Sequence, residues 1–266
     1  MVVALGLTGS VGHGSIGLSE LWPEHFSRVL SNGYDSMYLA GSDGLVFNLK
    51  CLPLPSKVEY APHRLGAVAN WCVGDHKVAL VLNRNGEILV FKDQRLQFAK
   101  RRGAWRYYPH DSVVRRLAVG TLRLRKAVYE SCLDVSFARA GGCLAVVSAP
   151  NVTKAGKMLQ DTDRIVSQSG PRTKLLKAIV KKPFHKLDRR LRQELLSMDG
   201  ATLVTHTGEV LTAGAIIAVP SGSTGGGRKA AALRLSKFGL AIKISADGIL
   251  RCLNHQCWCF TICRSF

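Results

Sequence analysis

The stretch from Met198 to Leu250 constrains this chain most, because turn, strand and helix patterns follow one another there within a short length. It opens with a carboxylate in a tight turn, Asp199-Gly200-Ala201, and continues in two apolar runs joined by a turn, which predict a β-hairpin. A run rich in glycine and serine, Ser221 to Gly227, then leads into a helix pattern from Ala230 to Lys237. We therefore expect a carboxylate turn and a flexible loop on one α/β framework.

The glycine run ends in two cations at the start of the helix pattern, and this combination predicts an anion site. Bare backbone N–H groups, hydroxyls, cations and a helix N-terminus together suit phosphate groups. The carboxylate of the preceding turn suits a metal ion or a ribose hydroxyl. The plainer alternative is a loop in front of a capped helix, which the glycines alone do not exclude. The candidate binding residues are Asp199, Gly200, Ala201, Thr224, Gly226, Gly227, Arg228 and Lys229.

These motifs resemble the diadenylate cyclase domain, the family that includes the DNA-integrity-scanning cyclases. The resemblance rests on the DGA turn at Asp199, the basic helix start Gly226 to Ala232, and the acidic turn Asp247-Gly248, in that order. The helix-then-strand unit from Ala127 to Val147 resembles the unit that precedes the DGA turn in the family. The match spans residues 113–250 and implies a central mixed β-sheet flanked by helices.

The basic segment departs from the family pattern at three positions. Gly227 stands where the family has a threonine, Lys229 replaces a histidine, and Ala230 replaces an arginine. Those groups handle the triphosphate in active cyclases, so their loss should weaken transition-state stabilisation. The chain also resembles a divergent branch of this fold that is predicted to sense nucleotides. The resemblance therefore implies a sensor that binds ATP or a cyclic dinucleotide with eroded catalysis.

Two alternatives stay open. In an active enzyme of this family, two ATP molecules on facing subunits would condense to cyclic di-AMP and pyrophosphate. Asp199 would then hold Mg²⁺ or Mn²⁺ and act catalytically, Arg228 would neutralise the phosphates, and the chain would form a homo-oligomer. The second alternative is a basic protein that binds nucleic acid, because the 266 residues carry a formal net charge of +19. The sequence contains no recognised nucleic-acid-binding motif, so only non-specific binding would be expected.

The rest of the chain predicts a β-rich extension in front of this domain, giving an α/β (α+β) fold overall. The clearest hairpin joins Val78–Leu82 to residues 87–91 through Asn85-Gly86. Residues 19–39 have helical periodicity, and residues 113–138 predict two helices broken at Gly120-Thr121. Residues 148–186 predict an exposed basic linker with a solvated helix face, and the alternative is a surface for a polyanion or for nucleotide entry. The expected divisions are a flexible glycine-rich N-terminus at 1–20, the extension at 21–112, the cyclase-like domain at 113–250, and a cysteine-rich tail at 251–266.

The apolar runs and the cysteines indicate in which cellular compartment the chain is expected. No apolar run approaches the ~20 residues that a membrane helix needs, so we expect no membrane span and a cytoplasmic protein. Cys51, Cys72, Cys132 and Cys143 lie in apolar patterns typical of reduced core cysteines. The tail brings Cys252, His255, Cys257 and Cys259 close together, but their spacing matches no standard structural zinc site.

Overall fold

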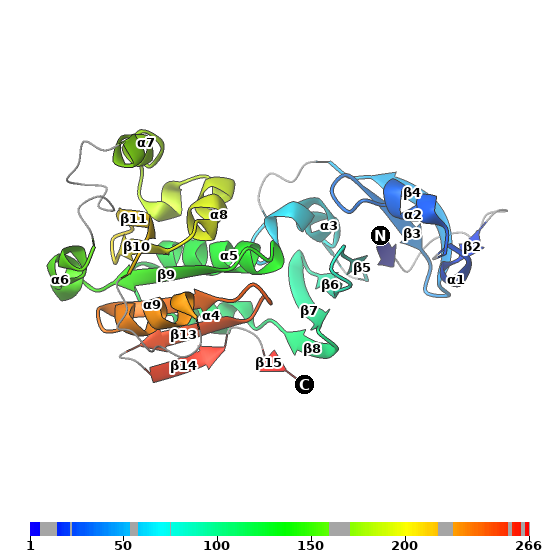
Figure 1. Ribbon diagram of the computed structural model, residues 1–266. Coiled ribbons are helices and arrows are strands. Elements are labelled where there is room, and N and C mark those ends of the chain that lie inside the picture. The colour runs from blue at the N-terminus through cyan, green and yellow to red at the C-terminus, as the bar shows by residue number, and fades with distance from the viewer. Residues whose placement is uncertain are drawn as a thin grey trace. The chain divides into compact units, whose positions relative to one another are not determined.

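The chain forms two compact units, which are described one at a time. The computed structural model describes residues 1–5, 15–21, 23–53, 58–74, 76–159, 171–217, 226–254, 257–261 and 264–265. The N-terminal unit comprises Met1–Pro109 with Cys263–Phe266, and the second unit comprises His110–Ile262. Each unit carries a mixed β-sheet with helices, so the expected α/β class is confirmed (Figure 1).

The N-terminal unit is built on a sheet of nine strands within the described residues, in the order β15-β8-β7-β6-β5-β1-β3-β4-β2. β1 is parallel to β3 and antiparallel to β5, and the other neighbours are antiparallel. The strands are β1 Val2–Leu5, β2 Ile16–Gly17, β3 Ser36–Ala40, β4 Leu45–Cys51, β5 Val78–Leu82, β6 Ile88–Lys92, β7 Arg95–Arg101, β8 Ala104–Tyr107 and β15 Arg264–Ser265.

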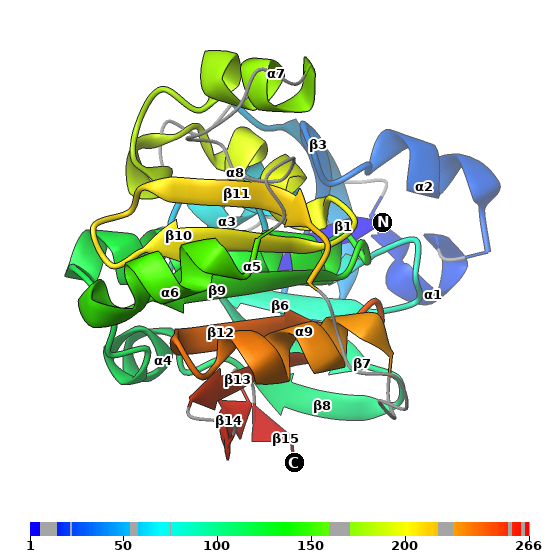
Figure 2. The same ribbon diagram turned by 60° about the vertical axis from the view of Figure 1, so that its left-hand side comes forward.

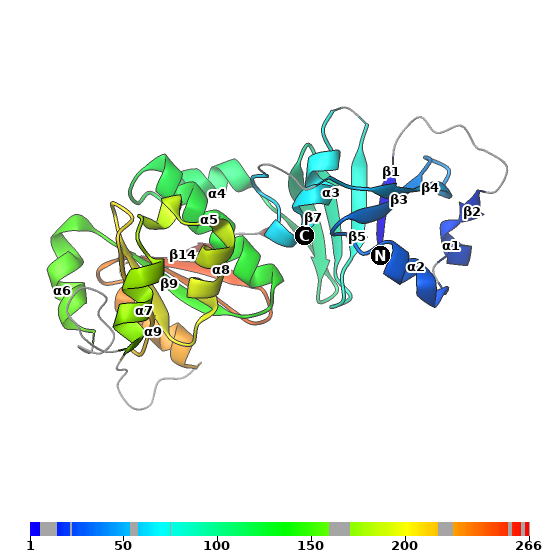
Figure 3. The same cartoon turned by 90° about the horizontal axis from the view of Figure 1, so that it is seen from above.

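Short helices cover parts of this sheet. The hairpin of β5 and β6 is confirmed, and Gly86 adopts the positive φ of +72° that its turn requires. α3 contacts β6 and lies beside the hairpin strands (Figure 3). The helical segments are α1 Leu18–Leu21, α2 His25–Leu30, the 3₁₀ turn η1 His63–Leu65 and α3 Gly66–Trp71.

Two expectations for the N-terminal unit are corrected. The helical periodicity expected to reach residue 39 ends at α2, because the Asn32 side chain accepts hydrogen bonds from the amides of Tyr34 (2.7 Å) and Asp35 (3.2 Å). This side-chain turn competes with helix and redirects the chain into β3. The flexible N-terminus expected over residues 1–20 does not hold for β1, whose Val2 is 1% exposed. The glycine-rich residues 6–14 lie outside the described residues.

The second unit contains a six-stranded sheet in the order β11-β10-β9-β12-β13-β14, within the part of the chain that the structure describes. β9 and β10 are parallel, with Thr202 opposite Leu144, and the other neighbours are antiparallel. Figure 2 shows these strands side by side, with α9 in front of β12. The strands are β9 Gly142–Val147, β10 Ala201–Thr205, β11 Val210–Ala215, β12 Gly239–Ile244, β13 Leu250–Asn254 and β14 Cys257–Thr261.

Helices cover both faces of this sheet. On one face, Cys143, Ala145 and Val147 of β9 share a buried core with Ala232 and Leu235 of α9. On the other face, the Thr202 hydroxyl donates to the carbonyl of Leu195 in α8, and α8 packs against α5. The helical segments are α4 His110–Arg116, α5 Leu122–Phe137, η2 Ala149–Asn151, α6 Val152–Lys157, α7 Pro171–Ile179, η4 Phe184–Lys186, α8 Arg189–Ser197 and α9 Gly227–Leu235.

The helical segments of this unit match one local prediction and extend another. The break between α4 and α5 is confirmed, and the Thr121 hydroxyl caps α5 by accepting from the Leu124 amide at 3.3 Å. The linker with a solvated helix face expected over residues 148–186 contains the helices α6 and α7, which also bury Ala155 and Leu176, and its residues 160–170 lie outside the described residues. None of the described helices combines the length and apolar character needed to cross a bilayer.

The cysteines follow the predicted pattern with one exception. Cys72, Cys132 and Cys143 are buried free thiols, as expected, whereas Cys51 is exposed at the end of β4. Of the tail residues considered for zinc, Cys252 is buried in β13, and His255 lies outside the described residues.

Candidate functional site

The Asp199 turn connects α8 to β10, and its three residues have different structural requirements. Gly200 has a φ of +105°, and a Cβ placed on it would lie 2.5 Å from the carbonyl carbon of Gly214 in β11. Ala201 is fully buried in the core beneath α9, where only a small side chain fits. Asp199 is exposed and makes no side-chain hydrogen bond or ion pair within the described residues. Glycine and alanine therefore build the turn, and the carboxylate is left accessible to a ligand.

Backbone hydrogen bonds to Gly226 form the basic helix start. Gly226 has a φ of +83°, and its carbonyl accepts hydrogen bonds from the amides of Lys229 (3.1 Å) and Ala230 (3.3 Å). The first amides of an α-helix have no partner within the helix, so the N–H groups at the start of α9 can bind an anion. Arg228 and Lys229 are half-buried, while Ala230 is 8% exposed and faces the core.

The sheet topology brings the carboxylate turn and the basic helix start to the same end of the six-stranded sheet. The parallel strands β9 and β10 both begin there, at Gly142 and Ala201. Their paired residues Leu144 and Thr202 each lie three positions after Gly141 and Asp199, respectively. The antiparallel β12 ends there, with Ile244 opposite Gly142. Arg228 reaches this edge as well, because a Cβ placed on Gly141 would lie 3.1 Å from its Nη1 atom. Asp199 and Arg228 are thus not on opposite sides of the unit.

A third cation lies at this edge that sequence reasoning did not identify. Arg139 follows α5 with a φ of +59°, and its Nη1 atom donates to the carbonyl of Ala246 at 3.5 Å. The Ala246 amide nitrogen would lie 3.3 Å from a Cβ on Gly141, so Arg139 and Arg228 approach the same turn. The only sequence signal was a basic residue just before the glycine pair Gly141-Gly142 that ends the helix pattern.

The charge of Arg228 is close to the core at this edge. Burial raises the pKa of the Cys143 thiol to about 12, and the positive charge of Arg228 opposes that rise. The Nε atom of Arg228 is buried and has no hydrogen-bond partner in the described structure. A buried donor without a partner carries a desolvation cost, which an incoming acceptor such as a phosphate oxygen would remove.

Part of the predicted site falls outside the described residues. Thr224 and the rest of the run from Ser221 to Gly225 lie there, so the hydroxyls expected to contact phosphate cannot be placed. Within the described part, no group of three or more His, Cys, Asp or Glu side chains is arranged to hold a metal ion. Asp199 is therefore the candidate metal ligand in the predicted site, and a nucleotide would have to supply further oxygen ligands.

Comparison with known proteins gives limited information. No protein-family model matches the sequence, and no curated protein matches it. Among solved structures, a double-cysteine mutant of DacA from Staphylococcus aureus is similar to part of this chain. The match covers 58% of this chain and 86% of the DacA chain. The two sequences are 14% identical and the TM-score is 0.32, a level of similarity from which we infer nothing about ligand or activity.

Proposed function

We propose that this chain binds an adenine nucleotide, ATP or cyclic di-AMP, as a signal. The binding site lies at the end of the six-stranded sheet where the strands β9 and β10 begin. Arg228, Lys229 and the first amides of α9 bind the phosphates. Asp199 faces a ribose hydroxyl or a nucleotide-bound metal ion. The proposal combines the diadenylate-cyclase-like motifs of the sequence with the geometry of this edge.

The observation that carries the proposal is the close approach of the Arg228 guanidinium group to Gly141. This guanidinium group lies beside Gly141, at the end of the sheet where β9 and β10 begin, and the exposed Asp199 directly precedes β10. The buried Nε atom of Arg228 lacks an acceptor in the described structure. A cation held in a partly buried position binds phosphate more strongly than a fully solvated one, because the local dielectric constant is lower.

A divalent cation fits this arrangement if it enters with the nucleotide. Mg²⁺ is commonly bound through one or two carboxylates together with substrate phosphates and water. Asp199 supplies one accessible carboxylate, which is consistent with that mode and not with a site built from protein ligands alone. Asp199 would hold the metal ion, which would help to neutralise the charge of the phosphates.

Isothermal titration calorimetry with ATP and with cyclic di-AMP tests the proposal. Arg228→Gln should weaken binding about tenfold or more, since charge-assisted hydrogen bonds contribute roughly 1.5–3 kcal/mol. Lys237→Gln is the matched control, because it removes an exposed charge just beyond the other end of α9 and should leave the affinity unchanged. Absence of heat with both ligands at millimolar concentration would exclude the proposal.

Catalysis is the second candidate, and the accessible Asp199 carboxylate favours it. Against it, Ala230 is buried where the family has an arginine, and Gly227 offers no hydroxyl. Losing one group that stabilises developing charge typically costs a factor of about 10² to 10³ in rate. Incubation with ATP and Mg²⁺ or Mn²⁺, followed by chromatography, separates the candidates. Cyclic di-AMP formation that is lost in Asp199→Asn would establish an enzyme, whereas binding without product would support a sensor.

The basic composition supplies the third candidate, binding of nucleic acid through the net charge of +19. Such binding releases counterions, so the affinity for duplex DNA would fall steeply as salt is raised. Duplex binding that Arg228→Gln leaves intact would assign it to the general surface charge and not to the nucleotide site.

A further inference from the structure

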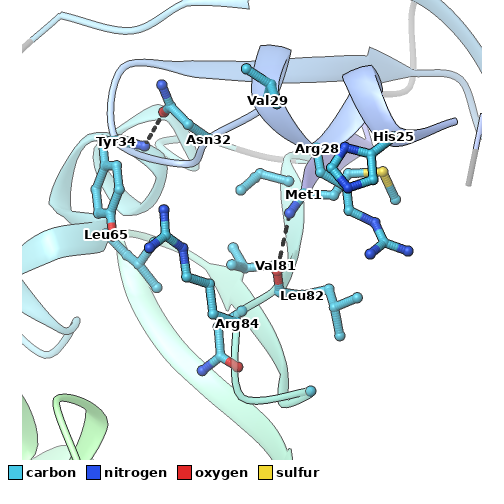
Figure 4. Close-up of a pocket in the computed structure, with 13 residues that line it drawn as sticks. Met1, His25, Arg28, Val29, Asn32, Tyr34, Leu65, Val81, Leu82 and Arg84 are labelled. Atoms are coloured by element: carbon cyan, nitrogen blue, oxygen red, sulfur yellow. Dashed lines mark hydrogen bonds between the residues drawn. The ribbon is translucent and has the colours of Figure 1, made fainter.

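The N-terminal unit contains a cavity of about 710 Å³ that the proposed nucleotide site does not involve. Its walls come from α2, from the turn between α2 and β3, from η1, and from the start of β1 and the β5–β6 hairpin (Figure 4). Cavities of roughly 300–1,000 Å³ are typical of sites for small organic molecules. The size and the number of contributing elements therefore suit a ligand.

The charged side chains that line the cavity are basic. His25 and Arg28 come from α2, Arg84 comes from the hairpin turn, and no Asp or Glu is among the described lining residues. Arg28 and Arg84 form no hydrogen bond or ion pair with another side chain in the part of the chain that the structure describes. A concave surface that carries charge of one sign concentrates the field and attracts the opposite charge.

Two neighbouring carboxylates are already engaged. Asp35 accepts a hydrogen bond at 2.6 Å from the Nδ2 atom of the lining residue Asn32. Glu87 forms a buried ion pair with Arg101 and accepts a second hydrogen bond at 2.6 Å from Asn83. Their hydrogen-bonding capacity is therefore directed away from Arg28 and Arg84, whose guanidinium groups remain available for an external anion.

The cavity also exposes apolar surface. Val29 is 69% exposed and Tyr34 is 47% exposed, although both line the cavity, and Leu65 and Val81 extend the apolar wall. Figure 4 shows the Arg84 side chain extending from the hairpin turn toward Tyr34. An apolar ligand body covering these side chains would remove their surface from water, which is favourable.

We propose that this cavity is a second ligand site and that it binds a small organic anion, an apolar body that bears a phosphate or carboxylate group. The Arg84 guanidinium, which extends toward Tyr34, binds the anionic group, because its planar fork matches phosphate and carboxylate oxygens, and Arg28 adds positive charge from the opposite wall (Figure 4). The Tyr34 ring and the Val29 side chain pack against the apolar body.

Titration of the full chain with four small probes tests this site. Naphthyl phosphate and naphthoate carry both features, naphthol lacks the charge, and inorganic phosphate lacks the apolar body. We expect either organic anion to bind more tightly than naphthol and inorganic phosphate. The tighter of the two anions identifies the preferred anionic group.

Matched variants locate the binding. Arg28→Gln/Arg84→Gln should weaken binding of the organic anion about tenfold or more, whereas Lys50→Gln/Lys92→Gln, which removes the same charge from exposed positions of the same unit, should not. Tyr34→Ser should weaken binding of naphthyl phosphate but not of inorganic phosphate. Arg228→Gln should leave naphthyl phosphate binding unchanged, which separates this site from the nucleotide site.

Three results would overturn the proposal. The first is equal affinity for the organic anion in Arg28→Gln/Arg84→Gln and in Lys50→Gln/Lys92→Gln. The second is naphthol binding as tightly as the charged probes. The third is no binding of either organic anion to the unmodified chain at millimolar concentration. Because all four substituted cations are exposed, comparable thermal midpoints should verify that the variants fold.

Discussion

The guanidinium group of Arg228 lies against the Cα atom of Gly141, in the turn that leads from α5 into β9. A Cβ atom on Gly141 would lie 3.1 Å from Nη1 and 3.3 Å from Cζ of Arg228. Gly141 also has a φ of +70°, which glycine adopts without the strain of a side chain. The position of this cation therefore depends on a glycine that is distant in sequence.

Gly141→Ala should affect both stability and ligand binding. The positive φ costs about 1–3 kcal/mol for a residue with a side chain, and the added methyl group crowds the Arg228 guanidinium, which must shift away from Gly141. We expect a lower urea midpoint together with weaker nucleotide binding by calorimetry. Gly44→Ala is the control, because its φ is +78° and nothing lies within 4 Å of the added atom. A Gly141→Ala variant that binds nucleotide normally would show that the contact is irrelevant to the ligand.

Gly200→Ala should destabilise the second unit more than a positive φ alone explains. The new Cβ atom would lie 2.5–2.6 Å from backbone atoms of Gly214 and Ala215, which cannot move without disturbing β11. We expect a loss of about 2 kcal/mol or more beyond the loss in Gly226→Ala, measured by urea unfolding. Gly226 has a φ of +83° and open space around it. The loss of stability in Gly226→Ala therefore measures the cost of the positive φ alone. Equal losses in both variants would contradict this explanation.

The α5–α8 interface should depend on the ion pair of Asp134 and Arg189. Two hydrogen bonds of 2.7 and 3.0 Å join them, and the Asp134 side chain is only 1% exposed. Asp134→Ala leaves a partly buried guanidinium without this partner, which typically costs about 3–5 kcal/mol. The double variant Asp134→Leu/Arg189→Met replaces both charges with apolar groups and should recover much of the loss. Denaturant unfolding of both variants measures the difference.

Stability should fall on the alkaline side through the buried thiols. Burial raises the pKa of Cys143 from its ordinary value of 9.0 to about 12 in the folded state. The unfolded state then loses its proton first as the pH rises from 9 toward 12. The stabilisation is fully present below pH 9 and declines by about 1.4 kcal/mol per pH unit above it. Cys143→Ala should therefore show a shallower decline than the unmodified chain, and parallel curves would argue against a buried thiol.

Local sequence signals predicted several elements in both units well, because they act between residues close in the chain. The Asn85-Gly86 turn specified the β5–β6 hairpin, and Thr121 specified the start of α5 through its own side chain. The apolar run at Cys143 predicted a strand buried on both faces, and β9 is buried along its length. Each of these elements was confirmed because its cause lies within a few residues.

The strands β1 and β3 could not be predicted in the same way. Four residues, Val2 to Leu5, carry no periodicity of their own, and their pairing partners lie far along the chain. β3 follows a helical pattern that the Asn32 side chain interrupts, and its apolar residues fit either structure. Whether these residues form a helix or a strand depends on pairing with distant strands. A local pattern in a single sequence carries no information about that pairing.

In the candidate site, too, residues in local motifs could be predicted from the sequence, whereas contacts between distant segments could not. Asp199 and Arg228 were found from sequence because each belongs to a compact motif. Arg139 was missed because it approaches the site only through a left-handed turn and a hydrogen bond to Ala246, which is remote in sequence. The seat of Arg228 on Gly141 likewise exists only once β9 and α9 have packed.

The interior position of β1 in its sheet has a consequence for the synthesis of the protein. Val3 pairs with Tyr38 on one side and with Leu80 on the other. Ribosomes make chains from the N-terminus, so β1 leaves the exit tunnel before either of its neighbours has emerged. Its valines stay exposed to solvent or to chaperones until β5 has emerged, so the middle of the sheet closes only after Leu82 has left the ribosome.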